Sequence, residues 1–262
     1  MKRFGKTFVI TEASAMNYAD KIGILIQAIV RAAGRDGVVL GLSGGVDSAV
    51  VAALCVRAQE PVCGVSLPYG DGMDKSGSAA RVQELVERFP EIDFLGVVDI
   101  EPGCRASELP ADSLLWVEAS AHNVELAKMN IRARARMNVL YQIATLKRLL
   151  VIGTDNLSEN VTGYFTKWGD GANDLQPLSM LTKREVYILA RALGVPQSII
   201  DAAPSAELAE GQTDEDELGF TYEQIDKWIL DGSSGDPIAD ASIAERYRFT
   251  AHKREPIPVF TG

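Results

Sequence analysis

The alternation of short β-branched runs with helical patterns is the feature that most constrains how this chain can fold. Runs rich in valine, isoleucine and leucine predict strands at 38–42, 62–67, 94–100 and 149–153. Apolar residues at helical spacing predict a first helix at 14–33 and later helices at 46–58, 76–88 and 117–147. Strands joined through helices pair in the same direction. The fold class is therefore α/β: a doubly wound, mostly parallel sheet with helices on both faces.

The length and composition fit a single globular domain that spans 1–262. The 262 residues are 47% hydrophobic and 24% charged, which is the balance of a folded protein with a sizeable core. The strand–helix alternation occupies about 37–200. A polar, acidic segment at 204–219 is predicted to be a mobile loop. The C-terminal helices and tail at 220–262 are expected to extend the same domain rather than to form a second core.

Charge and cysteine usage exclude several classes of protein. The net charge of −10 opposes binding along the phosphates of a nucleic acid. The three cysteines are odd in number and lack the spacing of metal ligands, which indicates reduced thiols. No apolar run approaches the roughly 18 residues of a membrane span. We therefore expect a cytoplasmic protein that binds neither nucleic acid nor membrane.

The segment Ser43-Gly44-Gly45-Val46-Asp47-Ser48 ends the first expected strand and begins a helix. Adjacent glycines let backbone N–H groups approach an anion, and the helix start contributes further unpaired N–H groups. A carboxylate at Asp47 suits phosphate binding only where a cation bridges the two. The alternative is an ordinary serine-capped turn. The preceding strand, the following helix and the two serine hydroxyls together favour a phosphate-binding loop.

This loop is not a Walker A motif, because it lacks the Gly-Lys-Ser/Thr sequence. It resembles the loop of the N-type ATP pyrophosphatases, which split ATP between its α and β phosphorus atoms. That resemblance implies an adenine nucleotide alpha hydrolase-like fold with ATP as co-substrate. By itself it indicates only that the protein adenylates something.

A second set of motifs narrows the family. Gly153-Thr154-Asp155-Asn156 follows the fourth expected strand, and a glycine- and aromatic-rich segment runs from Gly163 to Gly171. The set also includes Leu67-Pro68-Tyr69-Gly70, Asn130-Ile131-Arg132-Ala133-Arg134 and Leu181-Thr182-Lys183-Arg184-Glu185. In this order and spacing, the motifs resemble NAD synthetase from about residue 15 to His252-Lys253.

The resemblance implies a role for each matching residue. Asp47 and Glu159 would bind Mg²⁺, and Lys183 would neutralise charge on the ATP phosphates. The ATP-binding residues would be Gly41, Leu42, Ser43, Gly44, Gly45, Val46, Asp47, Ser48, Thr154, Lys183 and Ser205. Those that contact deamido-NAD⁺ would be Arg134, Lys167, Asp174, His252 and Lys253.

Ser205 stands where the family has a threonine, in the segment Pro204-Ser205-Ala206. Serine keeps the hydroxyl that would reach the nucleotide. Because Ser205 begins the acidic 204–219 segment, we expect that segment to order over bound ATP as a lid.

The implied reaction has two steps. The nicotinate carboxylate of deamido-NAD⁺ attacks the α-phosphorus of ATP and expels pyrophosphate. Ammonia then attacks the activated carboxyl and expels AMP, which leaves NAD⁺. Asp170 and Asp174 are the candidates for taking a proton from ammonium. The resemblance also implies a homodimer, for which the 117–147 helix is long enough to supply the interface.

The nitrogen source has two interpretations. Asn156-Leu157-Ser158 and 207–219 look closer to the glutamine-using branch of the family, yet only about 40 residues precede the phosphate loop, too few for its amidase domain. No cysteine has the partners of a glutaminase nucleophile. Free ammonia is therefore expected, unless a separate glutaminase protein docks.

Two other functions stay open as alternatives. One is a different amidotransferase, or a tRNA-modifying adenylating enzyme, with the same loop. The other is a non-catalytic ATP-binding module, which needs no second Mg²⁺ carboxylate and neither Lys167 nor Lys183. Pyrophosphate release from ATP plus deamido-NAD⁺ separates the module from the enzymes.

Overall fold

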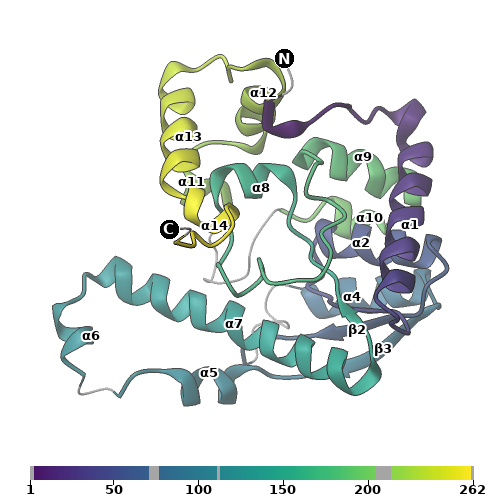
Figure 1. Ribbon diagram of the computed structural model, residues 1–262, viewed down its shortest axis with the longest axis horizontal. Coiled ribbons are helices and arrows are strands. Elements are labelled where there is room, and N and C mark those ends of the chain that lie inside the picture. Colours follow the sequence, from purple (N-terminus) through teal and green to yellow (C-terminus); the bar gives the residue numbers. More distant parts are fainter. Residues whose placement is uncertain (1–2, 71–76, 111–112, 204–213, 261–262) are drawn as a thin grey trace.

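A parallel sheet lies at the centre of the computed structural model, which describes residues 3–70, 77–110, 113–203 and 214–260. Within those ranges the sheet has four strands in the order β3-β2-β1-β4, all parallel. They are β1 (Val38–Gly41), β2 (Val62–Ser66), β3 (Ile92–Val97) and β4 (Leu150–Val151). Figure 1 labels two of them, β2 and β3. The predicted α/β fold is confirmed.

Helices occupy the connections between strands and the C-terminal third of the chain. The longer ones are α1 (Ala15–Ala32), α2 (Val46–Arg57), α4 (Ser78–Arg88), α7 (Ala121–Lys147), α9 (Lys183–Leu193), α12 (Tyr222–Asp231) and α13 (Pro237–Phe249). The shorter ones are α5 (Glu101–Ser107), α6 (Leu114–Glu118), α8 (Leu157–Thr162), α10 (Gln197–Ile200), α11 (Asp214–Leu218) and α14 (Ala251–Arg254), with two 3₁₀ turns at Arg3–Gly5 and Glu12–Ser14.

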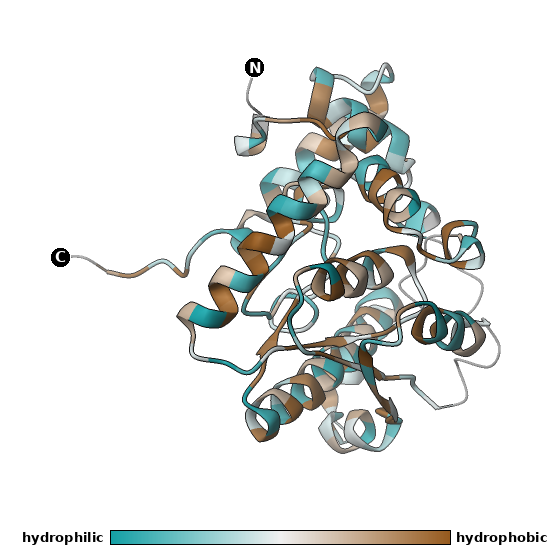
Figure 2. Cartoon of the chain, turned by 90° about the vertical axis from the view of Figure 1, so that its right-hand side faces the viewer, coloured by the Kyte–Doolittle hydropathy of each residue, from teal (hydrophilic) through white to brown (hydrophobic). Residues whose placement is uncertain are grey.

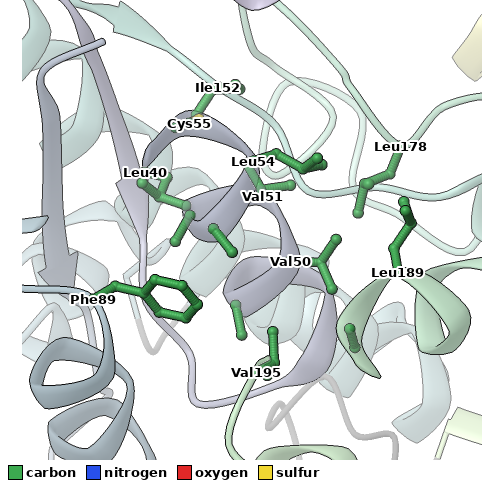
Figure 3. Packing of buried hydrophobic residues seen from close by; sticks show 14 of the residues in the cluster. Leu40, Val50, Val51, Leu54, Cys55, Phe89, Ile152, Leu178, Leu189 and Val195 are labelled. Carbon is green, nitrogen blue, oxygen red and sulfur yellow. The ribbon is translucent and has the colours of Figure 1, made fainter. Parts of the chain in front are cut away.

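Successive side chains of a strand point to opposite sides of the sheet. Helices cover the apolar side chains on both faces. Val38 and Leu40 belong to the large apolar cluster with α1, α2, α4 and α9, whereas Val39 packs with the end of α7 on the other face. Helix α2 lies between β1 and α9 and is apolar nearly all round. Figure 3 shows its Val50, Val51 and Leu54 surrounded by residues of the strands and of α9.

The C-terminal helices have a small apolar cluster of their own. Leu157 and Val161 of α8 contact Ile225 and Trp228 of α12 and Ile243 of α13. We expected this region to extend the domain without a second core. The apolar cluster of this region is a small satellite that includes residues of α8, and the region is joined to the rest of the molecule through α8 and α9. In Figure 2 apolar residues line the inner sides of the helices, and the C-terminal tail extends away from the body.

Several boundaries differ from the predicted ones for local reasons. The predicted helix at 117–147 is two helices, α6 and α7, because Ser120 takes an extended conformation and its hydroxyl accepts the N–H of Asn123 as an N-cap. The last strand is shorter than predicted, although Ile152 adds a bridge to Leu175 beyond it. Most of the predicted mobile loop, 204–213, lies outside the described residues, and helix α11 follows it.

The order of the strands sets where a ligand can bind. The chain runs from β1 outward to β2 and β3 and then returns to place β4 on the other side of β1. The strand order reverses between β1 and β4, so the connections after these two strands leave in opposite directions, which opens a crevice at their carboxyl ends. The loops that follow β1 and β4 are the phosphate loop and the Gly153–Asn156 segment.

A buried ion pair fixes the start of α9 to the N-terminal segment. Glu185 is 1% exposed, and its carboxylate accepts hydrogen bonds from the Ile10 and Thr182 N–H groups at 2.7 and 2.8 Å. It also pairs with Lys6 at 2.8 Å. Thr182 and Glu185 form a capping box at the start of this helix.

We predict that Glu185→Gln lowers the free energy of unfolding by about 3 kcal/mol, because it leaves the Lys6 ammonium buried without its counter-charge. Asp20→Asn is the control, since it removes an exposed carboxylate that pairs with Arg57, and it should cost less than about 1 kcal/mol. Urea unfolding of both variants measures the difference. Equal losses would show that the buried pair contributes no more than a surface one.

Candidate active site

A cavity of about 480 Å³ opens at the carboxyl ends of β1 and β4. Its wall brings together the two loops that the topology singles out, with α7 and the start of α9. The lining includes the loop Gly41–Ser48 and the charged or polar side chains of Arg81, Arg136, Thr154, Asp155, Glu159, Tyr164, Asp170, Lys183 and Asp214. The six residues of the predicted phosphate loop, the preceding Gly41 and Leu42, and Thr154 therefore all line one space.

The phosphate loop is held in shape before any ligand binds. Gly44 has φ +77°, and a Cβ there would lie 2.9 Å from the Ser78 carbonyl oxygen, so only glycine fits. The Ser43 and Ser48 hydroxyls are 3.1 Å apart, and Ser43 also accepts the Gly45 N–H at 3.2 Å. Helix α2 begins at Val46, directly after this turn. Its free N–H groups and positive dipole end suit an anion.

The predicted pair of carboxylates meets at a lysine. Lys183 Nζ lies 2.6 Å from Asp47 Oδ2 and 3.5 Å from Glu159 Oε1. The lysine is 4% exposed, so its ammonium is almost fully removed from bulk solvent. Asp47, Glu159 and Lys183 come from three helices, α2, α8 and α9, and converge at the same end of the cavity.

This arrangement changes the proton affinity of each group. Burial raises the pKa of Glu159 to about 8, with a further contribution from Asp47. Burial alone would lower the pKa of Lys183, but Asp47 and Glu159 outweigh it and raise that pKa, so the amine stays charged. Burial and the nearby Asp170 raise the pKa of Asp155. The site thus concentrates carboxylates around one fixed cation.

Local hydrogen bonds position Glu159 and Asp47. Asn156 is the N-cap of α8: its side-chain oxygen accepts the Glu159 N–H at 3.1 Å, and its own N–H donates to Glu159 Oε2 at 3.0 Å. The Asn156 side-chain nitrogen also donates to Asp47 Oδ1 at 3.0 Å. One asparagine therefore orients both carboxylates.

Four of the five residues expected to contact deamido-NAD⁺ lie together beside the 163–171 loop. Arg134 donates to the Lys167 carbonyl oxygen at 3.4 Å, and Lys167 Nζ donates to that of His252 at 2.5 Å. Lys253 Nζ donates to the carbonyl oxygens of Gly163 and Phe165 at 2.8 and 2.6 Å. In the single chain these amines tie the loop to α14. Their contacts with substrate stay a prediction.

Asp174 lies apart from that group. Its carboxylate accepts the Val151 N–H at 2.8 Å and the Tyr141 hydroxyl at 3.3 Å, so it extends the hydrogen bonding of β4. Asp170 lines the cavity and accepts the Thr166 N–H at 2.7 Å. Of the two carboxylates considered for ammonium, Asp170 is the one on the cavity wall.

Two arginines of the cavity, Arg81 and Arg136, are absent from the site residues assigned from the sequence. Arg81 of α4 donates through Nε to the Gly44 carbonyl oxygen at 2.9 Å, which brings its guanidinium beside the phosphate loop. Arg136 of α7 donates to the Leu67 carbonyl oxygen at 3.0 Å. Arg136 follows Arg132 and Arg134 at a spacing of two residues in the predicted long helix, and this run of arginines was a usable signal. The sequence around Arg81 gave no such signal, because its pattern predicts an ordinary amphipathic helix.

Two groups from the C-terminal third also reach this region. The Tyr222 hydroxyl lies 2.9 Å from Asp214 Oδ2 and 3.4 Å from Glu159 Oε1, and Lys183 Nζ is 4.9 Å from the centre of the Tyr222 ring. Asp214 is buried and starts α11, so this end of the predicted acidic loop packs against the site. Ser205 lies outside the described residues.

Metal-binding clusters and membrane-spanning helices are two further features that a structure can reveal. Across the described ranges, no cluster of three or more His, Cys, Asp or Glu side chains is arranged to hold a metal ion. Nor does any helix in that part of the chain combine the length and apolar character needed to traverse a bilayer.

Comparison with known proteins gives a consistent result. The sequence model of the NAD synthase family matches residues 18–256. An NH₃-dependent NAD⁺ synthetase of Pyrococcus furiosus is 41% identical over 82% of this chain and 78% of its own length. That of Mesoplasma florum is 41% identical over 90% of this chain and 93% of its own.

Among solved structures, the NMN synthetase of Francisella tularensis superposes with a TM-score of 0.84 at 36% identity, covering 95% of this chain and 99% of that one. The family match spans both loops of the cavity and the helices that carry Asp47, Glu159 and Lys183. The chain belongs to the NAD synthase family.

Proposed function

We propose that this protein makes NAD⁺ by ATP-dependent amidation of deamido-NAD⁺ with ammonia. The observation that carries the proposal is the convergence of Asp47, Glu159 and Lys183 beside a preformed phosphate loop, in one cavity. A plain nucleotide-binding module needs the loop but not a buried carboxylate–lysine cluster. The family match and the NH₃-dependent relatives support the same reaction.

The first step is adenylation. A nicotinate oxygen attacks the α-phosphorus of ATP, the bond from that phosphorus to the bridging oxygen breaks, and pyrophosphate leaves with the electron pair. The carboxylate is already nucleophilic, so this step needs no general base. The loop N–H groups, Arg81 and Lys183 would hold the phosphates in line and stabilise the charge that develops on pyrophosphate.

Mg²⁺ fits the chemistry of Asp47 and Glu159. Both are hard oxygen donors and already share one cation, since Lys183 Nζ contacts each of them. Two carboxylates are too few for a complete protein site, but Mg²⁺ commonly uses one or two carboxylates with substrate phosphates and water. When bound, the ion would neutralise phosphate charge.

The second step forms the amide. Ammonia attacks the acyl carbon, AMP leaves with the electron pair of the anhydride oxygen, and one proton must be lost from nitrogen. Ammonium must also lose one proton beforehand to become nucleophilic ammonia. Asp170 is our candidate for holding ammonium and taking this earlier proton, because it lines the cavity and is anchored by the Thr166 N–H.

Free ammonia is the proposed nitrogen source. A glutaminase nucleophile needs an accessible thiol with a lowered pKa. All three cysteines lie in the described part of the chain and are buried, and burial raises the pKa of each. Any use of glutamine would therefore require a separate glutaminase. The unpaired thiols also fit a reducing, cytoplasmic compartment.

We propose a homodimer built on α6 and the first turns of α7. These elements extend away from the sheet in Figure 1. Leu114 and Leu115 are 71% and 63% exposed, and Leu126 is 44% exposed, so the arm offers apolar surface to a partner. A second copy is the partner that the family implies.

A mononucleotide substrate is the second candidate, favoured by the superposition on an NMN synthetase. Nicotinic acid mononucleotide has the same carboxylate as deamido-NAD⁺ but lacks the second nucleotide. The Lys167 and Lys253 amines, which were expected to meet the dinucleotide, are occupied by backbone carbonyl oxygens here. That occupation is compatible with the smaller substrate.

We predict that the purified protein forms NAD⁺ from deamido-NAD⁺, ATP and Mg²⁺ with ammonium, and releases one AMP and one pyrophosphate per NAD⁺. Replacing ammonium by glutamine in ammonia-free buffer should leave little turnover, because no thiol is available to hydrolyse it. A coupled assay for NAD⁺ measures both. Equal rates with the two donors would contradict free ammonia as the nitrogen source.

The same assay decides the substrate. We predict that kcat/KM for deamido-NAD⁺ exceeds that for nicotinic acid mononucleotide by about tenfold or more, since the second nucleotide adds contacts that the smaller substrate cannot make. A reversed ratio would assign the chain to mononucleotide amidation. Loss of activity with both acids would reject the whole proposal.

We predict that Asp47→Asn and Glu159→Gln each lower kcat by about 100-fold or more, because each removes a charged ligand from the phosphate-binding end of the site. Both should raise the Mg²⁺ concentration that gives half-maximal rate. Asp93→Asn is the matched control: it breaks another carboxylate–lysine pair, with Lys147, away from the cavity. Near-normal turnover of either site variant at limiting Mg²⁺ would contradict the shared metal site.

A further inference from the structure

A buried carboxylate outside the cavity holds the site elements together. Asp226 of α12 is 5% exposed, and it is absent from the described residues that line the cavity. Its Oδ1 accepts the Ser158 hydroxyl at 2.5 Å, and its Oδ2 accepts the Arg184 N–H at 2.8 Å. One side chain of α12 therefore bonds to α8 and to α9 at once.

Ser158 extends this contact to the neighbouring backbone. Its side-chain oxygen donates to Asp226 and accepts the Lys183 N–H at 3.0 Å. The first two N–H groups of α9 are thus bonded to Ser158 and Asp226, while the N-cap residue Thr182 turns its hydroxyl to Glu185 at 3.0 Å. The start of α9 is fixed by residues of two other helices, not only by its own cap.

Both site residues that are attached to this network meet in the cavity. Glu159 follows Ser158 in α8, and Lys183 is the residue whose N–H Ser158 binds. Their charged ends lie 3.5 Å apart. Tyr222, one turn before Asp226 on the same face of α12, reaches Glu159 Oε1 at 3.4 Å. Helix α12 therefore contacts Glu159 directly through Tyr222, and it contacts α8 and the start of α9 through Asp226.

We propose that Asp226 is a positioning residue for the adenylation step, one that sets the separation between the Glu159 carboxylate and the Lys183 ammonium. The proposal rests on the proposed function. Asp226 acts through the Ser158 hydroxyl and the backbone N–H groups of Lys183 and Arg184, and it touches no reacting atom. A shift of α9 relative to α8 would move Lys183 away from one of its two carboxylates, which misplaces the charge that ATP meets.

The test is Asp226→Asn, which keeps the size of the side chain but turns an N–H₂ group toward one of its two donors. We expect kcat and the affinity for Mg²⁺-ATP to fall by about 10- to 100-fold, as for other residues that orient charged site groups. The KM for deamido-NAD⁺ should change by less than about twofold, because a positioning defect at Lys183 affects the phosphates first. Asp231→Asn, on the exposed end of the same helix, is the matched control and should behave as wild type.

A double-mutant cycle with Lys183→Gln separates positioning from a merely structural role. If Asp226 acts by placing Lys183, Asp226→Asn should lower Mg²⁺-ATP affinity by less than about twofold once Lys183 is gone. Equal effects in both backgrounds would overturn the proposal. If Asp226→Asn does not fold, Ser158→Ala replaces it in the cycle, with the same two outcomes.

Calorimetric binding of Mg²⁺-ATP keeps this test independent of the overall reaction. A wild-type protein that binds Mg²⁺-ATP but makes no NAD⁺ would reject the proposed function while the cycle still decides the role of Asp226. Normal amidation by the wild type, together with equal effects of Asp226→Asn in the presence and absence of Lys183, would support the proposed function and reject the positioning role of Asp226.

Discussion

The burial of one ammonium group sets the conditions that the rest of the structure meets. Lys183 is 4% exposed, and a charge removed from water must be paired. Its partners Asp47 and Glu159 come from the connections after β1 and after β4. Those two strands are neighbours in the sheet, so the strand order is what allows the pairing. Asn156 and Tyr222 then fix the carboxylates that Lys183 requires.

The sequence predicted what depends on local chemistry and missed what depends on packing. The phosphate loop and the strand–helix alternation both follow from neighbouring residues, and the structure contains them. The family motifs predicted that Asp47 and Glu159 would share one Mg²⁺ and that Lys183 would meet the ATP phosphates, but not that Lys183 pairs with both carboxylates. Arg81 and Asp226 could not be anticipated, because their importance depends on which helices lie side by side. The break at Ser120 was missed because a serine inside an apolar pattern can either continue a helix or cap one.

The site separates charges of opposite sign within an acidic protein. The carboxylates lie around the Lys183 ammonium, with which they pair. The side chains of Arg81 and Arg136 line other parts of the cavity wall. Negative substrates therefore meet guanidinium groups and loop N–H groups rather than the overall charge of −10. Burial and neighbouring carboxylates raise the pKa of Glu159 and of Asp155. A raised pKa favours the protonated, neutral form, which reduces the repulsion between the carboxylates.

The same strand order affects when the site can exist during synthesis of the chain. The phosphate loop is complete by Ser48, but Asp47 meets its lysine only across 136 residues of sequence. Asp226 lies later still in the chain, 42 residues beyond its partner Arg184. A nascent chain therefore displays a phosphate loop without its counter-charges. Closing such long loops is slow, so assembly of this pocket belongs to the last stage of folding.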